Sequence, residues 1–555
     1  MSLTAAIDFG IFIKPMLHPS RTGFDRTANK KQLRAGNRGC RFTGFQPPFG
    51  QFVVGHNTTP ESQPSVKPSP RLEPRCALYQ HRDLVADKGC ALGMSAIGRS
   101  GMDIDATEIT QELAAYIAHA LESPVPAPVI EKTKHHLLDT LAAMVSGSHL
   151  PAGHVAIPFV RAQGGVEEAT VIGADFLTTA IYAAFANGMA AHADETDDTH
   201  QRGRMHPGAT IVPVALAMAE TEERSGTDLL GAIALGYDIG VRTNLSLGDK
   251  FLHDGGHSTH AIGSQFGGTA AAAALAGLDP AQTRIALSYC VQQAAGCPYY
   301  FRDKGHIEKA FDFSGMTARN GLTAVALVSH GFTGVDDPFN SPYGFFDIFT
   351  DDPHPGELID GLGTRFEILD GHIKKWTTGN PNQTAIESLL AIMQNQNIGP
   401  DDVEKIFVQL PRRRFEIANN SPMPDICMQH LLSVLLIDGT LTFASTHDED
   451  RMNDPQVLAL REKFELSVNS ELDALHPMRP AIVIVKTKEG GEFTARTDAA
   501  PGTPENPMSR DEVAEKALDL CAPVLGTDRA QRLVDSVYAI DNEASVDTLR
   551  PLLQN

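Results

Sequence analysis

The sequence lacks the cysteine and hydrophobic patterns that mark several protein classes. Its seven cysteines form no CxxC pair, so neither a zinc ribbon nor a cysteine-ligated iron–sulfur cluster is indicated. A scattered, odd set of thiols is typical of a reducing compartment, and we expect a cytoplasmic protein. No apolar run approaches the roughly 18 residues of a membrane span, so no membrane association is expected.

Common nucleotide and hydrolase motifs are also missing. The chain contains no GxxxxGK[ST] loop, no strand–GxGxxG–helix unit and no GxSxG elbow. The net charge is −22, yet residues 1–101 hold 14 basic and 6 acidic side chains, so the remaining chain carries −30. An acidic body argues against a nucleic-acid partner, although it leaves room for a local basic pocket that binds an anionic substrate.

The first hundred residues differ from the rest. They are rich in proline, glycine and arginine and show no sustained helical period, so we expect residues 1–103 to be a disordered or wrongly assigned extension. An arginine-rich segment poor in acids also fits an organelle transit peptide, whereas Met94 or Met102 would be the first residue if the start was assigned too early. We expect that removal of residues 1–101 leaves activity and solubility intact.

From residue 104 onward the periodicity predicts a mainly α protein. Apolar residues recur at helical spacing over 107–121 and 132–145, and small residues dominate 226–241 and 267–277, which is typical of closely packed interior helices. Strand patterns at 404–410, 481–486 and 491–496 alternate with helical ones. We therefore predict an all-helical domain built from residues 104–368 and 501–555, with a smaller α/β domain, residues 369–500, inserted between them.

The most informative stretch is residues 192–207, HADETDDTHQRGRMHP. It holds three histidines, four acids and two arginines directly after an apolar helical run. Ionisable groups crowded at the end of a buried helix are costly unless they bind something or react. Three interpretations remain open: a divalent metal site, a substrate-orienting segment, or a solvated loop. The metal ligands would be Asp194, Asp197, Asp198 and His200.

Other candidate residues are weak when taken singly. The glycine-rich run at 255–268 is either an anion site at a helix N-terminus or a plain turn. Lys309 precedes a predicted apolar helix, and Lys374 lies where the residue pattern changes from helical to mixed helix and strand. Arg412, Arg413 and Arg414 close a predicted strand, and we interpret them as a solvated end or a rim for anions.

Six segments in this order resemble the MmgE/PrpD family over residues 104–555: NGMAAHADETDDTH–HPG, GGHSTHAIG–FGGTAAAAALAGL, EKAFDFSGMTARNGLTAVALVSHGFTG, IKKWTTG, MPDICMQHLLSVLLIDG and ENPMSRDEV. Each segment is weak alone, but six in order are specific. The family includes 2-methylcitrate dehydratase, cis-aconitate decarboxylase and an iminodisuccinate epimerase. The resemblance implies a helical domain with an inserted α/β lid, a homodimer, and chemistry without metal or organic cofactor.

The resemblance also implies roles for particular residues. Those expected to be catalytic are His206, His257, Asp197 and Asp198, and those expected to bind substrate are Glu195, Thr199, Lys309, Lys374 and His430. Several positions depart from the family pattern: Glu195 replaces an aspartate, one extra residue precedes His206, Gly379 stands where a histidine is usual, and His430 replaces a tyrosine. These departures cluster where substrate should sit.

The chemistry of these residue types fits a lyase that acts on a small di- or tricarboxylate. A carbanion beside a carboxylate gathers negative charge, and without a metal fixed cations must stabilise it. We expect Lys309 and Lys374 to bind carboxylates and His206 and His257 to move the proton, with Asp197 and Asp198 orienting them. The alternatives are an epimerase of the same family, a metal-dependent hydrolase that uses the cluster from Asp194 to His200, and a binding protein without activity.

Overall fold

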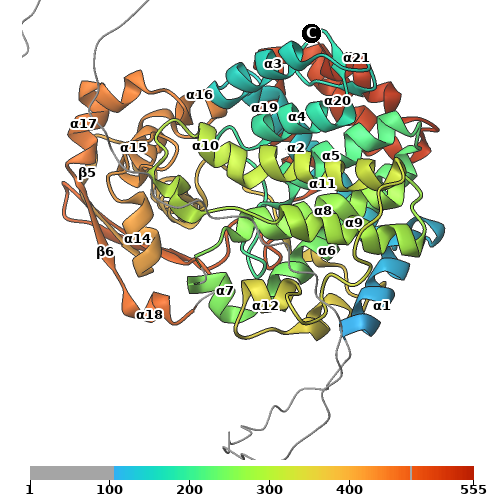
Figure 1. Cartoon of the computed structure of the whole chain (residues 1–555). Coiled ribbons are helices and arrows are strands. Elements are labelled where there is room, and N and C mark those ends of the chain that lie inside the picture. The colour runs from blue at the N-terminus through green and yellow to red at the C-terminus, as the bar shows by residue number, and fades with distance from the viewer. Residues whose placement is uncertain (1–105, 255, 476–477, 555) are drawn as a thin grey trace, which may run out of the picture. The chain divides into compact units, whose positions relative to one another are not determined.

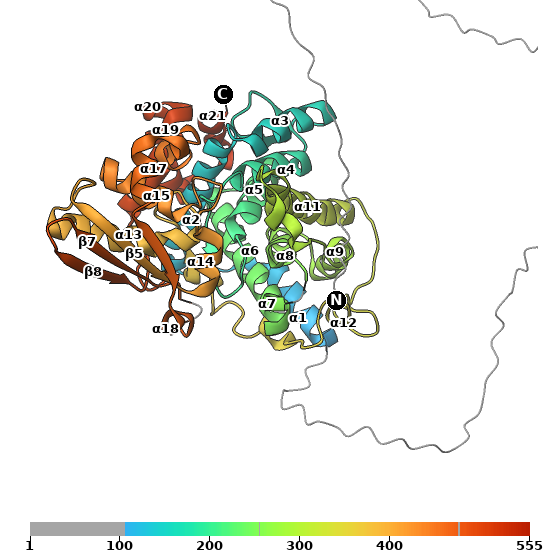
Figure 2. The same cartoon turned by 90° about the vertical axis from the view of Figure 1, so that its left-hand side faces the viewer.

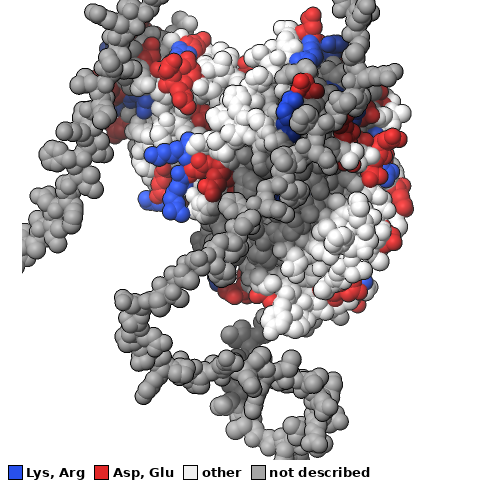
Figure 3. All heavy atoms as spheres, turned by 45° about the horizontal axis from the view of Figure 1, so that its top comes forward, with Lys and Arg blue, Asp and Glu red and all other residues white. Residues whose placement is uncertain are grey.

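The computed structural model describes residues 106–254, 256–475 and 478–554. The prediction of a mainly α fold is confirmed (Figure 1). The extension predicted for residues 1–103 lies outside the described residues. Within them, no helix is both long and apolar enough to cross a membrane. On the face drawn in Figure 3, lysine and arginine side chains occur in small groups among acidic ones, not as one basic surface.

Two hydrophobic cores divide the described chain. The larger core draws on residues 109–373 and again on residues 508–553, whereas the smaller one draws on residues 376–485. Figures 1 and 2 accordingly place the C-terminal helices α19 to α21 beside α2 and α3, and the sheet on the other side of the molecule. We call the part around the larger core the helical region and the part around the smaller core the α/β region.

Twelve helices precede the α/β region within the described residues: α1 (Ala106–His119), α2 (Ala127–Gly147), α3 (Pro151–Gln163), α4 (Ala180–Ala191), α5 (Pro207–Thr221), α6 (Gly226–Ser246), α7 (Gly248–Asp254), α8 (Thr259–Leu275), α9 (Pro280–Gln293), α10 (Ile307–Ala310), α11 (Met316–Ser329) and α12 (Phe345–Phe349). Three more complete the helical region: α19 (Arg510–Leu525), α20 (Thr527–Tyr538) and α21 (Arg550–Leu553). Capping boxes are present at Ser509 and at Asp279, where Pro280 opens α9.

Glycines let α6 and α8 approach backbone to backbone, as the small residues predict. A Cβ built on Gly240 would lie 2.8 Å from the carbonyl oxygen of Gly263, and one on Gly267 would lie 2.4 Å from that of Gly236. Real side chains do not tolerate such contacts, so any larger residue would push the helices apart. This close packing fixes α8, whose first turn carries His260.

The α/β region is built on a four-stranded sheet with the order β6-β5-β7-β8. Its strands are β5 (Val403–Leu410), β6 (Phe464–Val468), β7 (Ala481–Thr487) and β8 (Glu492–Thr497), and its helices are α13 (Gln383–Gln396), α14 (Arg412–Ala418), α15 (Met428–Asp438), α16 (Phe443–Thr446), α17 (Pro455–Arg461) and α18 (Ser470–Asp473). β5 pairs in parallel with β6 and antiparallel with β7. Strand β6 is absent from the sequence-based expectation, and Arg412–Arg414 open a helix instead of closing a strand.

Two short ladders brace the helical region. β1 (Ala169–Thr170) pairs with β2 (Leu177–Thr178). β3 (Thr199–His200) pairs with β4 (Gly371–His372), with Thr199 opposite His372. The second ladder matters for the site, because it ties the acidic stretch to the segment that carries Lys374.

Candidate active site

Residues 192–206 form a buried loop between α4 and α5. Helix α4 ends at His192, whose backbone N–H still bonds to Gly188, and α5 starts with Pro207, which suits the first helical turn. Between them Asp194 accepts hydrogen bonds from the backbone and hydroxyl of Thr196, at 2.9 and 2.6 Å. Such aspartate-centred turns compete with helix, so the acidic residues stop α4 and make the loop.

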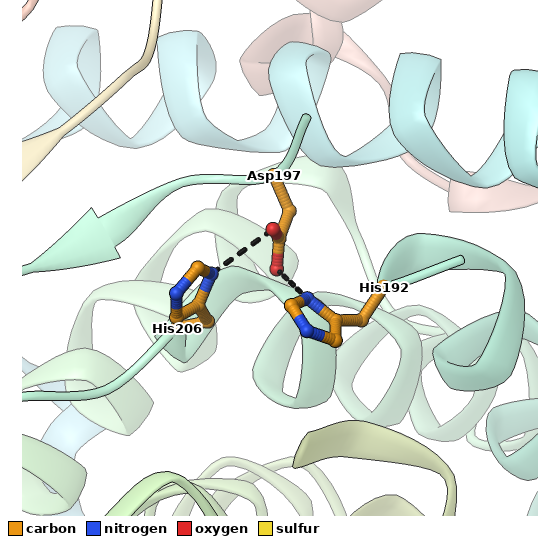
Figure 4. A group of neighbouring side chains, drawn as sticks. All are labelled: His192, Asp197 and His206. Atoms are coloured by element: carbon orange, nitrogen blue, oxygen red, sulfur yellow. Dashed lines mark hydrogen bonds and ion pairs between the residues drawn. The ribbon is translucent and has the colours of Figure 1, made fainter. Parts of the chain in front are cut away.

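Asp197 bridges two imidazoles at the centre of the loop (Figure 4). One carboxylate oxygen lies 2.9 Å from Nδ1 of His192 and the other lies 3.0 Å from Nδ1 of His206. Because burial is offset by His192, His206 and Lys374, the pKa of Asp197 stays well below its usual value. A carboxylate only accepts, so each Nδ1 carries a proton.

The ring of Phe313 forms the aromatic wall of the site. It stacks on His260 at 3.8 Å and on His192 at 4.4 Å, and it lies 5.4 Å from His206. Phe313 belongs to one turn of π-helix, Phe311–Gly315, between α10 and α11. Such turns are rare and occur often at functional sites, because they aim a side chain where an α-helix would not.

Two lysines from separate segments reach the loop. The Lys374 ammonium is fully buried, 2.6 Å from the carbonyl oxygen of Glu195 and 3.5 Å from the Asp197 carboxylate. Lys309 forms an ion pair with Glu195. Although burial alone would raise the pKa of Glu195, Lys309, His306 and Lys374 hold it well below its usual value. The structure thus brings together predicted residues Glu195, Asp197, His206, Lys309 and Lys374.

Burial sets the protonation of the histidines in this cluster. It lowers the pKa of His206 to about 4, with Asp197 opposing and Lys374 adding to the effect. It also lowers the pKa of His260 well below the usual value. Both rings are therefore neutral at pH 7, which leaves them free to accept a proton.

The sequence suggested that Asp198 orients His206 or His257, but its hydrogen bonds go to other residues. Its carboxylate bonds to Nδ1 of His136 and to the hydroxyl of Tyr237, both at 2.6 Å, and to the backbone N–H of Gly208 at 3.0 Å. The change of direction arises because consecutive residues in an extended loop point to opposite sides. Asp198 thus ties the loop to α2, α5 and α6. Thr199 lies at the edge of the loop, where Asn380 donates to its hydroxyl at 3.2 Å.

The structure does not bring His257 or His430 into the cluster. His257 contacts Phe251 and Phe349 at a surface hollow beside α7, while His260, one helical turn further along the chain, takes the place beside His206. His430 is fully buried in α15, within the α/β region, where Arg461 and Arg451 are its charged neighbours. His260 therefore replaces His257 as the second histidine of the site.

Three further site residues escaped the sequence analysis. His306, in a left-handed backbone conformation, has its ring 5.1 Å from that of His192. His447, after α16, lies 2.8 Å from the carboxylate of Asp194. Burial raises the pKa of Asp425 to about 6, although the positive charges of His447 and Lys309 act to lower it. No spacing rule links these positions, because each comes from a separate segment.

The four residues considered as metal ligands, Asp194, Asp197, Asp198 and His200, do not point their side chains at one position. Asp194 faces His447, Asp198 faces His136, and the His200 ring accepts from the backbone N–H of Gly203. A different set, His192, Asp197 and His206, offers donor atoms that all lie within 4.8 Å of one another. In those three residues the Nδ1 protons already occupy the carboxylate, so a metal bound by Asp197 would displace these hydrogen bonds, whereas the carboxylate engages neither Nε2 atom.

His447 joins α16 to the catalytic loop, which leads to a pH prediction. Burial alone would lower the pKa of His447, but the hydrogen bond to Asp194 and its charge raise it to about 9. The stabilisation, on the order of 3 kcal/mol, is fully present below pH 6.5 and is lost as pH rises through about 9. We expect the melting temperature to fall over pH 7–9.5, and to fall less in His447→Gln than in wild type or in the exposed control His330→Gln. Equal pH profiles in all three proteins would contradict this linkage.

Lys516 anchors the same loop from the C-terminal segment. Its ammonium bonds to Asp139 at 2.5 Å and to the carbonyl oxygen of Thr196 at 2.9 Å, and all three groups are buried. Lys516→Met leaves the Asp139 carboxylate buried without its cation, so we expect a loss of about 3–5 kcal/mol of stability. Urea unfolding measures it, with Lys405→Met, which removes a partly exposed lysine paired with Glu465, as control; the double variant with Asp139→Asn should recover part of the loss. A loss no larger than that of the control would show that the pair is not needed.

Comparisons with known proteins agree with this architecture. The MmgE/PrpD N-terminal domain matches residues 111–358 and the C-terminal domain matches residues 379–541. The chain is 27% identical to the cis-aconitate decarboxylase-like protein oryM of Aspergillus oryzae over 80% of this chain and 97% of that one. It is 26% identical to cis-aconitate decarboxylase of Homo sapiens and 23% identical to that of Aspergillus terreus, again over 80% of this chain and over 94% and 96% of theirs. The chain belongs to the MmgE/PrpD family.

Proposed function

We propose that the protein is a lyase that decarboxylates or dehydrates a small tricarboxylate of the cis-aconitate type, without metal or organic cofactor. The observation that carries the proposal is the bridge of Asp197 between His192 and His206, beside the ammonium groups of Lys374 and Lys309. It supplies a neutral base, His206, held in one tautomer next to fixed positive charge. The names of the relatives support the same substrate class.

In the decarboxylation, the bond between a carbon and its carboxylate breaks and CO₂ leaves. The bond pair stays on carbon, is delocalised toward the neighbouring carboxylate, and takes up one proton. Lys309 and Lys374 stabilise the carboxylates and the charge that develops on them. Bound carboxylates also raise the pKa of His206 from about 4, because negative charge favours the imidazolium, so the ring takes a proton from solvent and serves as the acid that supplies it to carbon.

The test is direct. Purified protein is incubated with cis-aconitate, citrate and methylcitrate, and released CO₂ and unsaturated products are measured. We expect turnover of at least one tricarboxylate. Turnover of none would overturn the proposal.

A second candidate is an epimerase of the same family. The rings of His192 and His206 lie 5.0 Å apart on one carboxylate, a pair that could remove a proton from one face of a carbon and return it to the other. Exchange of substrate hydrogen with deuterated water, without net elimination, would favour this candidate over the lyase.

Metal removal separates both candidates from a metal-dependent hydrolase. We expect that EDTA and subsequent gel filtration leave the activity unchanged and that the protein carries less than 0.1 equivalent of any divalent ion, as an order-of-magnitude bound, because Asp197 is occupied by two imidazoles. Elemental analysis and activity measured on the same sample check this. A stoichiometric ion whose removal abolishes activity would contradict it.

The assembly and location expected from the family resemblance, a cytoplasmic homodimer, are part of the proposal. Light scattering on the purified full-length chain tests the dimer, and fractionation of the source cells tests the location. We expect twice the chain mass of 59.7 kDa.

A further inference from the structure

The carboxylate of Glu195 lies against the ammonium group of Lys309 at the catalytic loop. The two side chains form an ion pair and are only 11% and 17% exposed, so solvent screens their attraction little. The Lys309 ammonium also lies 5.2 Å from the centre of the Phe313 ring, the aromatic wall of the site. The ion pair therefore borders the same wall as His192, His206 and His260.

Two imidazole nitrogens near this carboxylate have no partner. Nε2 of His306 lies 4.0 Å from the Glu195 carboxylate, which is too far for a hydrogen bond. Nε2 of His306 and Nε2 of His192 are both buried and have no hydrogen-bond partner among the described residues. His192, Glu195 and His306 each place one donor or acceptor atom within 4.8 Å of the other two. Buried polar atoms without partners are rare, so we expect a polar group of a ligand beside Glu195.

Cations that reach the loop from other segments already face carboxylates. The pairs are Lys309 with Glu195, Lys374 with Asp197, His447 with Asp194, and Lys516 with Asp139. A polycarboxylate therefore meets ammonium groups whose charge the protein itself neutralises. To form an ion pair of its own, the ligand must share or replace one of these carboxylates.

Beside the two lysines of the site, Glu195 holds the carboxylate that a ligand can replace most easily. Asp197 is held by two imidazoles as well as by Lys374. Within the described part of the chain, the Glu195 carboxylate accepts a hydrogen bond from Lys309 alone. The backbone carbonyl of Glu195 is bonded separately to Lys374, so the side chain can turn while the loop stays in place.

We propose that Glu195 and a carboxylate of the substrate compete for the ammonium group of Lys309. The inference rests on the proposed function, because it concerns the same substrate. Since Lys309, His306 and Lys374 hold the pKa of Glu195 well below its usual value, this side chain is an anion that repels a second carboxylate. This is the opposite of the substrate-binding role that the family resemblance implied for it.

The competition makes Glu195 a specificity-determining residue. Glu195 is tethered beside Lys309, so its effective concentration there is high. It weakens every ligand that places a carboxylate on Lys309 and leaves other ligands unaffected. A ligand succeeds only when further contacts hold it in the site, which favours a polycarboxylate over a simple monocarboxylate.

Calorimetry with the full chain tests the competition, with tricarballylate (propane-1,2,3-tricarboxylate) as the probe. We expect Glu195→Gln to bind tricarballylate about tenfold more tightly than wild type, because the competing anion is gone. Lys309→Met added to Glu195→Gln should remove this gain, and this pair leaves no buried charge without its partner. The control Glu308→Gln removes a charge from an exposed position next to Lys309 and should bind as wild type does.

Glu195→Asp is a second variant, which keeps the charge but shortens the side chain by one methylene. The shorter side chain should lose its contact with Lys309, so we expect binding intermediate between wild type and Glu195→Gln. If neither variant binds more tightly than wild type, Glu195 does not compete. If the double variant binds as tightly as Glu195→Gln, the gain does not involve Lys309. Binding by Glu195→Asp equal to that of wild type would indicate general repulsion. Each of these results would overturn the proposal.

Steady-state kinetics on a substrate that wild type turns over provides a second readout. In Glu195→Gln the KM should fall about as much as the dissociation constant of tricarballylate, while kcat does not rise. A merely structural role would lower kcat or stability without tightening the binding.

The two proposals fail in different ways. If wild type turns over cis-aconitate but Glu195→Gln binds tricarballylate no more tightly, the competition is wrong and the lyase stands. If wild type turns over no carboxylate but Glu195→Gln gains affinity that depends on Lys309, the lyase is wrong and the competition stands.

Discussion

His206→Asn lowers kcat about a thousandfold while the protein remains folded. The ring it removes is the neutral base whose Nδ1 is bonded to Asp197 and whose Nε2 keeps the lone pair. A positioned acid or base contributes about a hundred- to ten-thousandfold to a proton transfer, and no other described imidazole takes its place on that oxygen of Asp197. Steady-state kinetics on the substrate found for wild type, together with circular dichroism, measures the effect.

The paired controls are His257→Asn and His260→Asn. His257 lies at the surface hollow and should retain activity within about threefold, whereas His260, stacked on Phe313, should lose more than about tenfold. A larger loss of activity in His257→Asn than in His260→Asn would contradict the geometry. It would mean that His257, the residue expected from the family resemblance, works together with His206. If the reaction is the dehydration, in which His206 removes a proton, the acid limb of the kcat/KM profile should lie near pH 4, because His206 is protonated, and unable to accept a proton, below its pKa of about 4.

Asp197→Asn lowers kcat about a hundred- to a thousandfold. The carboxylate accepts from two imidazoles and faces the Lys374 ammonium, and an amide can accept at only one of its two ends. The amide oxygen should stay toward Lys374 and His206, so the NH₂ group faces His192 and forces its proton to Nε2. The loss of charge also removes the anion that stabilises a protonated His206. Kinetics and pH profiles of the folded variant measure both effects.

Asp198→Asn is the matched control for Asp197, one residue away and equally buried. Its carboxylate serves His136, Tyr237 and Gly208, so we expect a lower melting temperature and a near-normal kcat in the folded protein. A large loss of kcat without loss of stability would return Asp198 to the catalytic set predicted from the sequence.

Much of the fold follows from local pattern. The small residues of α6 and α8 predicted closely packed interior helices, and the structure has them in backbone contact. Strand β6 was missed because it follows α17 after only two residues and lacks clear alternation. Pairing with β5, which lies more than fifty residues earlier, is what makes it a strand.

The sequence indicated which residues gather at the site better than it indicated where their side chains point. The sequence singled out residues 192–207, but which acid faces which histidine depends on the exact turn. His257 and His260 flank Ser258, whose hydroxyl caps α8, and the place where the helix begins decides which ring points inward. His447 and Asp425 come from the α/β region, and only the packing of α16 against α19, where Phe443 donates to Asp519, brings His447 to the loop.

Because of the hydrogen bond from Lys516 to Thr196, the complete loop can form only after the whole chain has been synthesised. Thr196 is synthesised 320 residues before Lys516. The loop at residues 192–206 therefore cannot form its buried hydrogen bond to Lys516 until the whole α/β region has been synthesised. Any chain that stops before α19 can collapse its early helices but holds Asp139 without a cation. We therefore expect activity only in chains whose last helices have been synthesised and packed, and no activity in chains that end before α19.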